Sequence, residues 1–187
     1  MNVYPIEAGN FKLDGGAMFG VVPKSLWTKT NPADADNMIE MSSRCMLVEN
    51  SDKLILVDTG MGDKQSEKFF KYYKRWGSDN LVKSINSAGF SIDDVTDVLL
   101  THLHFDHCGG AVAWDSSKEA YDVLFKNANY WSNEKHWDWA TNPNPREKAS
   151  FLDENLFPIK ESGQLKFINN MSKGFNYCEE LGLEILC

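Results

Sequence analysis

The sequence predicts a single mixed α/β domain, and three observations lead to that fold class. The first sixty residues carry short runs of β-branched and aromatic residues separated by turn-forming residues, a pattern typical of strands. Apolar residues then recur at helical spacing between residues 63 and 89. A short apolar run, "VLLT", leads directly into the polar stretch "HLHFDHCGG", as at the end of a buried strand in an α/β fold. A length of 187 residues suits one domain, residues 1–187, with its own core.

The N-terminal part of the chain is expected to consist of strands and loops. Residues 3–9, 10–14 and 17–23 are predicted strands, because they are short, rich in β-branched and aromatic residues, and interrupted by glycines. Residues 25–37 are a predicted loop, since Pro32 and the alternating Asp and Asn residues disfavour regular structure.

A β-hairpin and two helices are expected next. Residues 39–50 and 53–60 are the two strands of the hairpin, joined by the turn "NSD". Residues 63–77 and 79–89 are the helices, with Gly77 as the expected C-cap of the first. Four aromatic residues of the first helix predict a stripe that lies in the core or at a subunit contact: Phe69, Phe70, Tyr73 and Trp76.

The remaining elements alternate between strand and helix. A short capped turn and a buried strand fill residues 91–101 and lead into the polar stretch. The elements expected after it are a strand, two helices and two further strands, at residues 122–133, 133–140, 144–155, 163–169 and 181–187.

The polar stretch has the spacing of a metal site. It holds His102, His104, Asp106 and His107, so three of the four histidines of the chain fall within six positions. Alternate residues of an extended segment point the same way, so the first two histidines can bind one cation together. Asp106 and His107 follow after a turn and can face a second cation. Imidazoles with one carboxylate suit zinc, or iron and manganese where the other ligands are oxygen-rich.

Residues beside this cluster have competing interpretations. Gly109 and Gly110 are expected to let the backbone turn sharply and to open a helix whose N-terminus faces the site. Cys108 could bind or be oxidised near a metal, but a small buried thiol that fills space is the favoured interpretation. His136 lies among Trp131, Trp137 and Trp139, which favours packing or surface exposure over metal binding.

Composition narrows the classes of partner. The net charge of −8 and the pI near 5.0 disfavour nucleic acid, although two bound divalent cations would offset four charges locally. No basic and apolar leader and no membrane-length apolar run is found, so neither secretion nor a membrane is expected. A cytoplasmic protein with reduced thiols is predicted, because no CxxC pairing occurs among Cys45, Cys108, Cys178 and Cys187.

Several motifs resemble those of the metallo-β-lactamase superfamily of metallohydrolases. "THLHFDHCGG", residues 101–110, resembles the metal-binding signature of that family. "ILVDTG", residues 55–60, resembles the preceding strand, whose aspartate, Asp58 in this sequence, braces the histidine loop. "LDGGAMFGVVPKSLW" and "NPREKASFLDENLFPI" resemble the branch that contains quorum-quenching lactonases and related esterases.

The resemblance implies an αββα sandwich with two divalent metal ions, zinc first among them, at one edge. His102 and His104 would bind the first ion, and Asp106 and His107 the second. A hydroxide activated by both ions would attack the carbonyl of a small lactone or ester, with Asp106 as the catalytic residue that holds the nucleophile or passes a proton to the leaving group. The family would also place four apolar residues at the substrate mouth, although ordinary packing explains them equally well: Met18, Phe19, Val22 and Trp27.

The sequence departs from the family in its remaining ligands. Neither the downstream "GHTPG"-like histidine, nor the bridging aspartate, nor the C-terminal histidine is found after His107. Each ion would then have two protein ligands, where catalytic zinc usually has three. The chain is therefore predicted to be the N-terminal portion of the fold. The missing part is expected to be a complementary C-terminal chain or a homodimer partner, a stretch lost to proteolysis, or a part lost by gene truncation. Two alternatives stay open: a non-catalytic fragment or subunit, and thioester, phosphoester or iron redox chemistry on the same scaffold.

Overall fold

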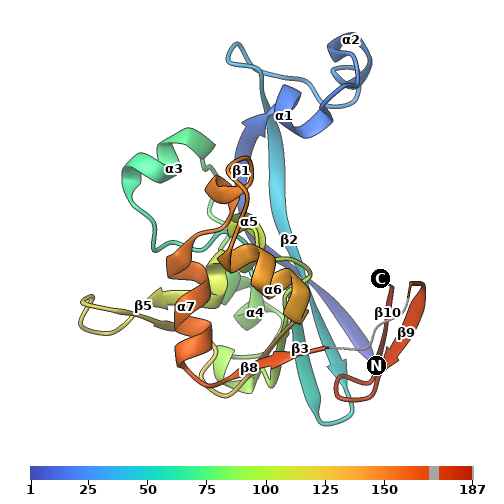
Figure 1. Ribbon diagram of the computed structural model, residues 1–187, viewed down its shortest axis with the longest axis vertical. Helices are drawn as coiled ribbons and strands as arrows, with labels where there is room; N and C mark the ends of the chain where they lie inside the picture. Colours follow the sequence, from blue (N-terminus) through green and yellow to red (C-terminus); the bar gives the residue numbers. More distant parts are fainter. Residues whose placement is uncertain (169–172, 187) are drawn as a thin grey trace.

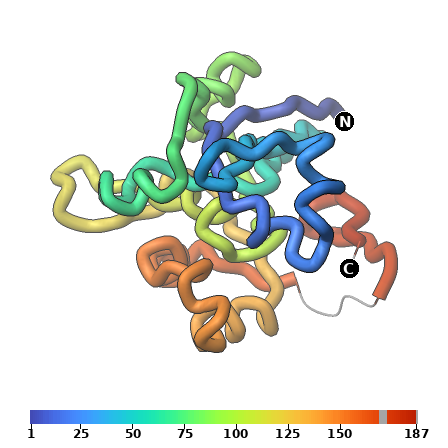
Figure 2. Tube along the Cα trace, turned by 90° about the horizontal axis from the view of Figure 1, so that it is seen from above, coloured from blue at the N-terminus to red at the C-terminus, as the bar shows by residue number. Residues whose placement is uncertain are grey.

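The computed structural model describes residues 1–168 and 173–186, and it confirms the predicted mixed α/β class (Figure 1). Six strands form the main sheet in the order β1-β2-β3-β4-β7-β8: Asn2–Asp14, Met38–Asn50, Lys53–Val57, Asp97–Leu99, Asn129–Ser132 and Leu165–Phe167. Two small hairpins complete the described strands: β5 and β6 (Val112–Trp114 and Tyr121–Val123), and β9 and β10 (Phe175–Cys178 and Leu183–Leu186). The β5–β6 hairpin projects from the side of the molecule in both views (Figures 1 and 2).

Seven α-helices and three 3₁₀ turns connect these strands within the described residues. The α-helices are α1 to α7: Gly15–Phe19, Lys24–Trp27, Glu67–Tyr73, Leu81–Ser87, Phe105–Cys108, Glu134–Thr141 and Asp153–Glu161. The 3₁₀ turns are η1 to η3: Ile92–Asp94, Gly109–Ala111 and Lys148–Ser150. None of the helices in this part of the chain is long and apolar enough to cross a membrane.

The main sheet is antiparallel at one edge and parallel at the other. β1, β2 and β3 pair antiparallel, with a bulge between Glu7 and Asn10, and the predicted β2–β3 hairpin is confirmed. β3, β4, β7 and β8 pair parallel. The carboxyl ends of parallel strands meet at one edge of a sheet, so the loops that follow these strands are brought together there.

Alternate residues of β3 divide the core between the two faces of the sheet. Leu54 and Leu56 belong to the larger cluster, which packs under α4, α6 and α7. Ile55 points to the opposite face and packs with Trp131 and with Leu181 of the C-terminal hairpin. This alternation is what a strand buried on both faces requires, and it fixes the register of the sheet.

Two predicted elements at the start of the chain differ from the structure. β1 runs without interruption through residues 3–14, so two predicted strands are one. Residues 17–23, predicted as a strand, form the end of α1 and a turn, because Asp14 accepts a hydrogen bond from the Ala17 backbone N–H at 2.8 Å and caps a helix. The local cap therefore outweighs the β-propensity of this segment.

Several helix and strand boundaries in the rest of the chain also differ from the predicted ones. The helix predicted over residues 63–77 ends with Lys74 in a left-handed conformation, three residues before Gly77. Residues 122–133 form two strands instead of one, since Tyr130 accepts a hydrogen bond from the Phe125 backbone N–H and holds a turn between them. The helix predicted from Asn144 begins at Asp153, since only the 3₁₀ turn η3 forms before it and Phe151 has an extended backbone.

Residues 25–27 of the predicted loop belong to helix α2, most other elements agree with the sequence, and two predictions lie partly outside the described residues. The helices at 79–89 and 133–140 correspond to α4 and α6. Asn169, the last residue of a predicted strand, and Cys187 lie outside the part of the chain that the structure describes. The three described cysteines, Cys45, Cys108 and Cys178, are buried and free.

Asp97 on β4 joins three neighbours in the sheet and is expected to be important for stability. It is 1% exposed and accepts hydrogen bonds from Trp131 Nε1 at 2.7 Å, Thr96 Oγ1 at 2.8 Å and Lys53 Nζ at 3.1 Å. Asp97→Ala is expected to lower the free energy of unfolding by about 3 kcal/mol in urea, because it leaves buried donors without an acceptor. The exposed Asp93→Ala is the control, with a change within about 0.5 kcal/mol. An equal loss of unfolding free energy in Asp97→Ala and Asp93→Ala would contradict this stabilising role of Asp97.

Candidate metal centre

Asp58, the predicted metal ligands and His136 follow three adjacent parallel strands. Asp58 comes directly after β3, and its backbone N–H donates to the Leu99 carbonyl of β4 at 2.9 Å. The histidine cluster follows β4, and β7 leads into α6, which carries His136. Since the three strands are parallel, their carboxyl ends bring these residues to one edge of the sheet.

The structure brings together the four predicted ligands. The ring centroids of His102 and His104 are 4.7 Å apart, and those of His102 and His107 are 3.9 Å apart. Asp106 Oδ2 lies 3.8 Å from His107 Nε2. His104 occupies the N-cap position of α5, so Asp106 falls in the first turn of that short helix and His107 in its last. Three imidazoles and one carboxylate therefore converge on one small region.

Asp58 holds the histidine loop at two points. Its Oδ2 lies 2.8 Å from His107 Nδ1, and its Oδ1 accepts a hydrogen bond from the Thr101 backbone N–H at 2.9 Å. The Thr101 hydroxyl donates to the same carboxylate, at 2.8 Å from Oδ2. A carboxylate that accepts from Nδ1 of a histidine fixes the tautomer and leaves Nε2 free to bind a metal. Asp58 therefore orients the His107 ring and anchors Thr101 in this structure.

Burial and neighbouring charges shift the two central histidines in opposite directions. Burial, together with His107 and His104 nearby, lowers the pKa of His102 to about 4, so its imidazole is neutral at physiological pH. Burial also acts to lower the pKa of His107, but the hydrogen bond with Asp58 and the charge of Asp106 raise it overall. A bound cation would compete with the proton on His107.

Gly109 and Gly110 differ from their predicted role. The helix of the cluster begins at Phe105, before the glycines, and Gly109 has ordinary right-handed angles. A Cβ on Gly109 would lie 2.2 Å from the Met61 carbonyl oxygen, and one on Gly110 would lie 2.2 Å from that of Thr59. The glycines are therefore needed for close approach of two backbones, which packs the histidine helix against the loop after β3.

The donor set fits a metal centre in part. Imidazole nitrogens and a carboxylate are the ligands that zinc prefers, and His107 is oriented by its acceptor. Across residues 1–168 and 173–186, however, no group of three or more His, Cys, Asp or Glu side chains is arranged to hold one metal ion. The four residues therefore supply an incomplete set of ligands.

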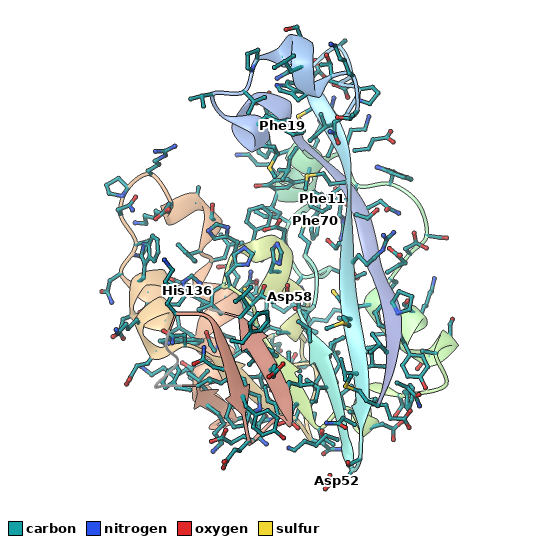
Figure 3. The ribbon with its side chains drawn as sticks, turned by 90° about the vertical axis from the view of Figure 1, so that its right-hand side faces the viewer. Phe11, Phe19, Asp52, Asp58, Phe70 and His136 are labelled. Atoms are coloured by element: carbon teal, nitrogen blue, oxygen red, sulfur yellow. The ribbon has the colours of Figure 1, made fainter. Side chains whose placement is uncertain are left out.

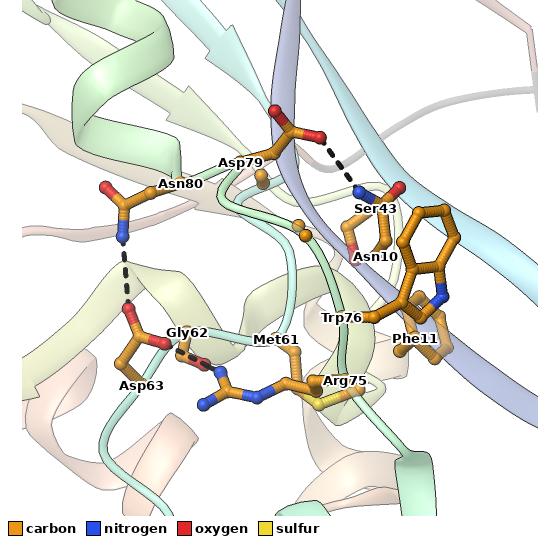
Figure 4. A pocket seen from close by; sticks show the side chains of 13 residues that line it. Asn10, Phe11, Ser43, Met61, Gly62, Asp63, Arg75, Trp76, Asp79 and Asn80 are labelled. Carbon is orange, nitrogen blue, oxygen red and sulfur yellow. Dashed lines mark hydrogen bonds and ion pairs between the residues drawn. The ribbon is translucent and has the colours of Figure 1, made fainter.

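Two neighbouring cavities adjoin this region. One, of about 170 Å³, is lined by Asp58, Asp106 and His107 together with residues of β1 and β2. It shares Phe11 and Ser43 with a second cavity of about 300 Å³, shown in Figure 4. Polar contacts already pair the charged side chains of the second cavity: Asp63 with Arg75 and Asn80, and Asp79 with Asn10.

The four residues predicted at the substrate mouth lie at the tip of the β1–β2 ribbon. Trp27 is 5% exposed, stacks on Phe19 at 4.9 Å between ring centroids, and fills the space beside Gly15. Met18 and Val22 are 46% and 44% exposed. Figure 3 shows Phe19 above Phe11 and Phe70, with Asp58 and His136 below them. The structure does not bring these four residues into either cavity beside the histidines.

Sequence reasoning underestimated His136. Its Nε2 accepts a hydrogen bond of 2.9 Å from the backbone N–H of Leu103, the residue between His102 and His104. The sequence places His136 shortly after a third predicted strand, and this position could have indicated its contact with the histidine loop. Cys108 behaves as expected of a packing thiol: it is fully buried, donates to the Leu103 carbonyl at 3.3 Å, and burial raises its pKa to about 12.

Lys64 is a second residue that the sequence did not single out. It is buried and donates to the Gly109 carbonyl at 2.5 Å, and burial lowers its pKa to about 8. The indole of Trp114 donates to the Lys64 carbonyl at 3.1 Å. Lys64 therefore ties the loop after β3 to the end of the histidine helix.

Comparisons with known proteins agree with this architecture. A family model described as the metallo-beta-lactamase superfamily matches residues 39–166. An N-acyl homoserine lactonase from Bacillus cereus is 28% identical over 104 residues, which are 50% of this chain and 40% of that protein.

Solved structures are similar over nearly the whole chain. A probable metal-dependent hydrolase from Staphylococcus aureus superposes with a TM-score of 0.81 at 29% identity, covering 95% of this chain and 61% of that one. AidC, a dizinc quorum-quenching lactonase in complex with a product, superposes with a TM-score of 0.65 at 26% identity, covering 97% of this chain and 65% of that one. The chain therefore spans less than two thirds of the length of each of these proteins.

Proposed function

Because the chain belongs to the metallo-β-lactamase superfamily, we propose that it is part of a metal-dependent hydrolase that opens lactones or related esters. The observation that carries the proposal is the convergence of three histidines and Asp106 at the carboxyl end of the parallel strands, with Asp58 oriented toward His107. The lactone assignment is supported by the lactonases among the similar proteins.

In this proposal the four ligands divide between two divalent cations, zinc being favoured by the donor set. His102 and His104 hold one cation, and Asp106 and His107 hold the other. When bound, the two cations supply an acidified water and polarise the substrate carbonyl. Asp58 keeps His107 in the tautomer whose Nε2 faces the site, and it fixes Thr101, the residue before His102.

Asp106 is the proposed catalytic residue of this chain. Its carboxylate lines the smaller cavity, so it can reach both a bound cation and a substrate placed there. It would orient the attacking oxygen and pass a proton to the alcohol that leaves when the ring opens. Its Oδ2 lies 3.8 Å from His107 Nε2, so the two side chains can act at the same point.

We further propose that residues 1–187 form one domain, and that a chain segment outside them or a partner subunit contributes the remaining ligands. The incomplete donor set and the partial coverage of the similar structures support this. A cytoplasmic location is proposed, and the buried free thiols are compatible with it.

Metal analysis together with a substrate panel tests the proposed function. The protein in its full natural length is expected to contain about two divalent ions per chain and to hydrolyse acyl lactones and simple esters. Chelation should abolish hydrolysis, and zinc should restore it. Bound redox-active iron with oxygen consumption would contradict the hydrolase, as would phosphoester or thioester turnover without lactone hydrolysis. A melting temperature that neither chelator nor zinc changes would favour a non-catalytic subunit.

A further inference from the structure

Leu103 separates His102 from His104, and side chains hold its backbone at both ends. Its N–H donates to His136 Nε2 at 2.9 Å, and its carbonyl accepts from the Cys108 thiol at 3.3 Å. The Leu103 side chain is fully buried. The peptide groups on both sides of Leu103 are therefore fixed. One joins Leu103 to His102, and the other joins the Leu103 carbonyl to His104.

The histidine loop leaves the sheet here and depends on side chains for its position. The last sheet-like contact is the Leu100 N–H, which donates to the Trp131 carbonyl at 3.0 Å. The two backbone N–H groups that flank His102 are those of Thr101 and Leu103. The first donates to Asp58 and the second to His136. Leu103 is fully buried, so its N–H without an acceptor would disfavour this backbone conformation, whereas Thr101 is exposed and its N–H can also be solvated.

We propose that His136 is a positioning residue for the His102–His104 pair, acting through its hydrogen bond to the Leu103 backbone N–H. The inference rests on the proposed function only in that the pair is taken to bind a metal ion. Asp58, which follows β3, then holds the backbone at Thr101, before the pair. His136, on α6, holds the backbone at Leu103, between the two histidines. Three adjacent parallel strands thus each contribute one element of the same centre.

The surroundings of His136 suit this role. Asn133 caps α6 and accepts from the His136 backbone N–H, and Trp137 anchors the helix in the main core. The ring of the buried Phe151 lies 5.9 Å from that of His136 and 4.9 Å from that of His104, so it confines both. With Nε2 facing an N–H donor, His136 is a positioning residue and not a fifth ligand in this arrangement.

Two substitutions of His136 test the inference in the protein of full natural length. His136→Phe keeps a ring of similar size but removes the acceptor, whereas His136→Gln keeps an acceptor at a similar reach. We expect His136→Phe to weaken zinc binding, measured by competition with a chromophoric chelator, by about 10- to 100-fold. Amide exchange at Leu103, measured by NMR on the metal-free protein, should accelerate by about tenfold. His136→Gln should stay within about threefold of the wild type in both measurements.

Trp137→Phe is the matched control, because it loosens the same helix from the core without touching the Leu103 peptide. Trp137→Phe should lower the melting temperature, yet its zinc affinity should stay within about threefold of the wild-type value. Unchanged zinc affinity in His136→Phe, failure of His136→Gln to restore it, or an equal loss in Trp137→Phe would each overturn the inference. If zinc binding responds as expected but no ester or lactone is hydrolysed, the inference stands and the proposed function fails. A wild-type protein that binds no zinc would overturn both.

Discussion

His104→Ala is expected to abolish hydrolysis in the full-length protein, with kcat/KM falling by at least about a thousandfold. His104 is one of two imidazoles proposed for the first cation, and its ring lies against that of His102. Losing one of the two proposed nitrogen ligands leaves this chain with a single proposed ligand for that cation. His102→Ala is expected to have the same effect, since the two act as a unit.

The measurement combines initial rates of ester or lactone hydrolysis with metal content after gel filtration. The loss of rate should be accompanied by the loss of about one metal ion per chain. Tyr72→Ala is the control, because it removes an exposed aromatic ring on α3 away from the cluster and should leave both values unchanged. Wild-type turnover in His104→Ala would remove this histidine from the centre.

The position of the candidate site could be predicted because its residues are close together in the sequence. His102, His104, Asp106 and His107 lie within six positions, so their spacing alone indicates a metal site. The β2–β3 hairpin was predictable for the same reason, since strand alternation and the turn are both contained in a short segment. Alternation also accounts for the opposite faces of Leu56 and Ile55.

What could not be predicted depends on contacts between distant segments. His136 meets Leu103 across 33 positions, and only the parallel pairing of β4 with β7 brings the two together. Gly109 is required by the approach of Met61, which no local pattern reveals. The ribbon tip was misassigned because the capping hydrogen bond of Asp14 outweighs the β-propensity of the residues that follow. The fold class and the contact of Asp58 with the histidine loop were thus predictable, and the contacts of His136 and Lys64 with that loop were not.

Asp106→Asn is expected to retain metal but to lose most of its turnover, with kcat falling by about 10²- to 10⁴-fold. Asn keeps an oxygen that can bind a cation, and it is nearly isosteric, so α5 and the neighbouring His107 should keep their positions. It removes the negative charge and the ability to take up a proton, which are the two properties that the proposed role requires. The expected result is therefore a protein with wild-type structure, partial metal content and little activity.

Asp63→Asn separates this role from a general effect of charge near the site. Asp63 is an exposed aspartate that pairs with Arg75 in the neighbouring cavity, so its neutralisation removes the same charge without touching the cluster. Activity close to wild type is expected for it. If Asp63→Asn lost as much activity as Asp106→Asn, the loss in both variants would be explained by the weaker negative electrostatic potential near the site and not by a lost proton transfer. Near-wild-type rates in Asp106→Asn would remove Asp106 from the chemistry and leave it only as a ligand. The protonation step would then have to be assigned to a residue outside this histidine cluster.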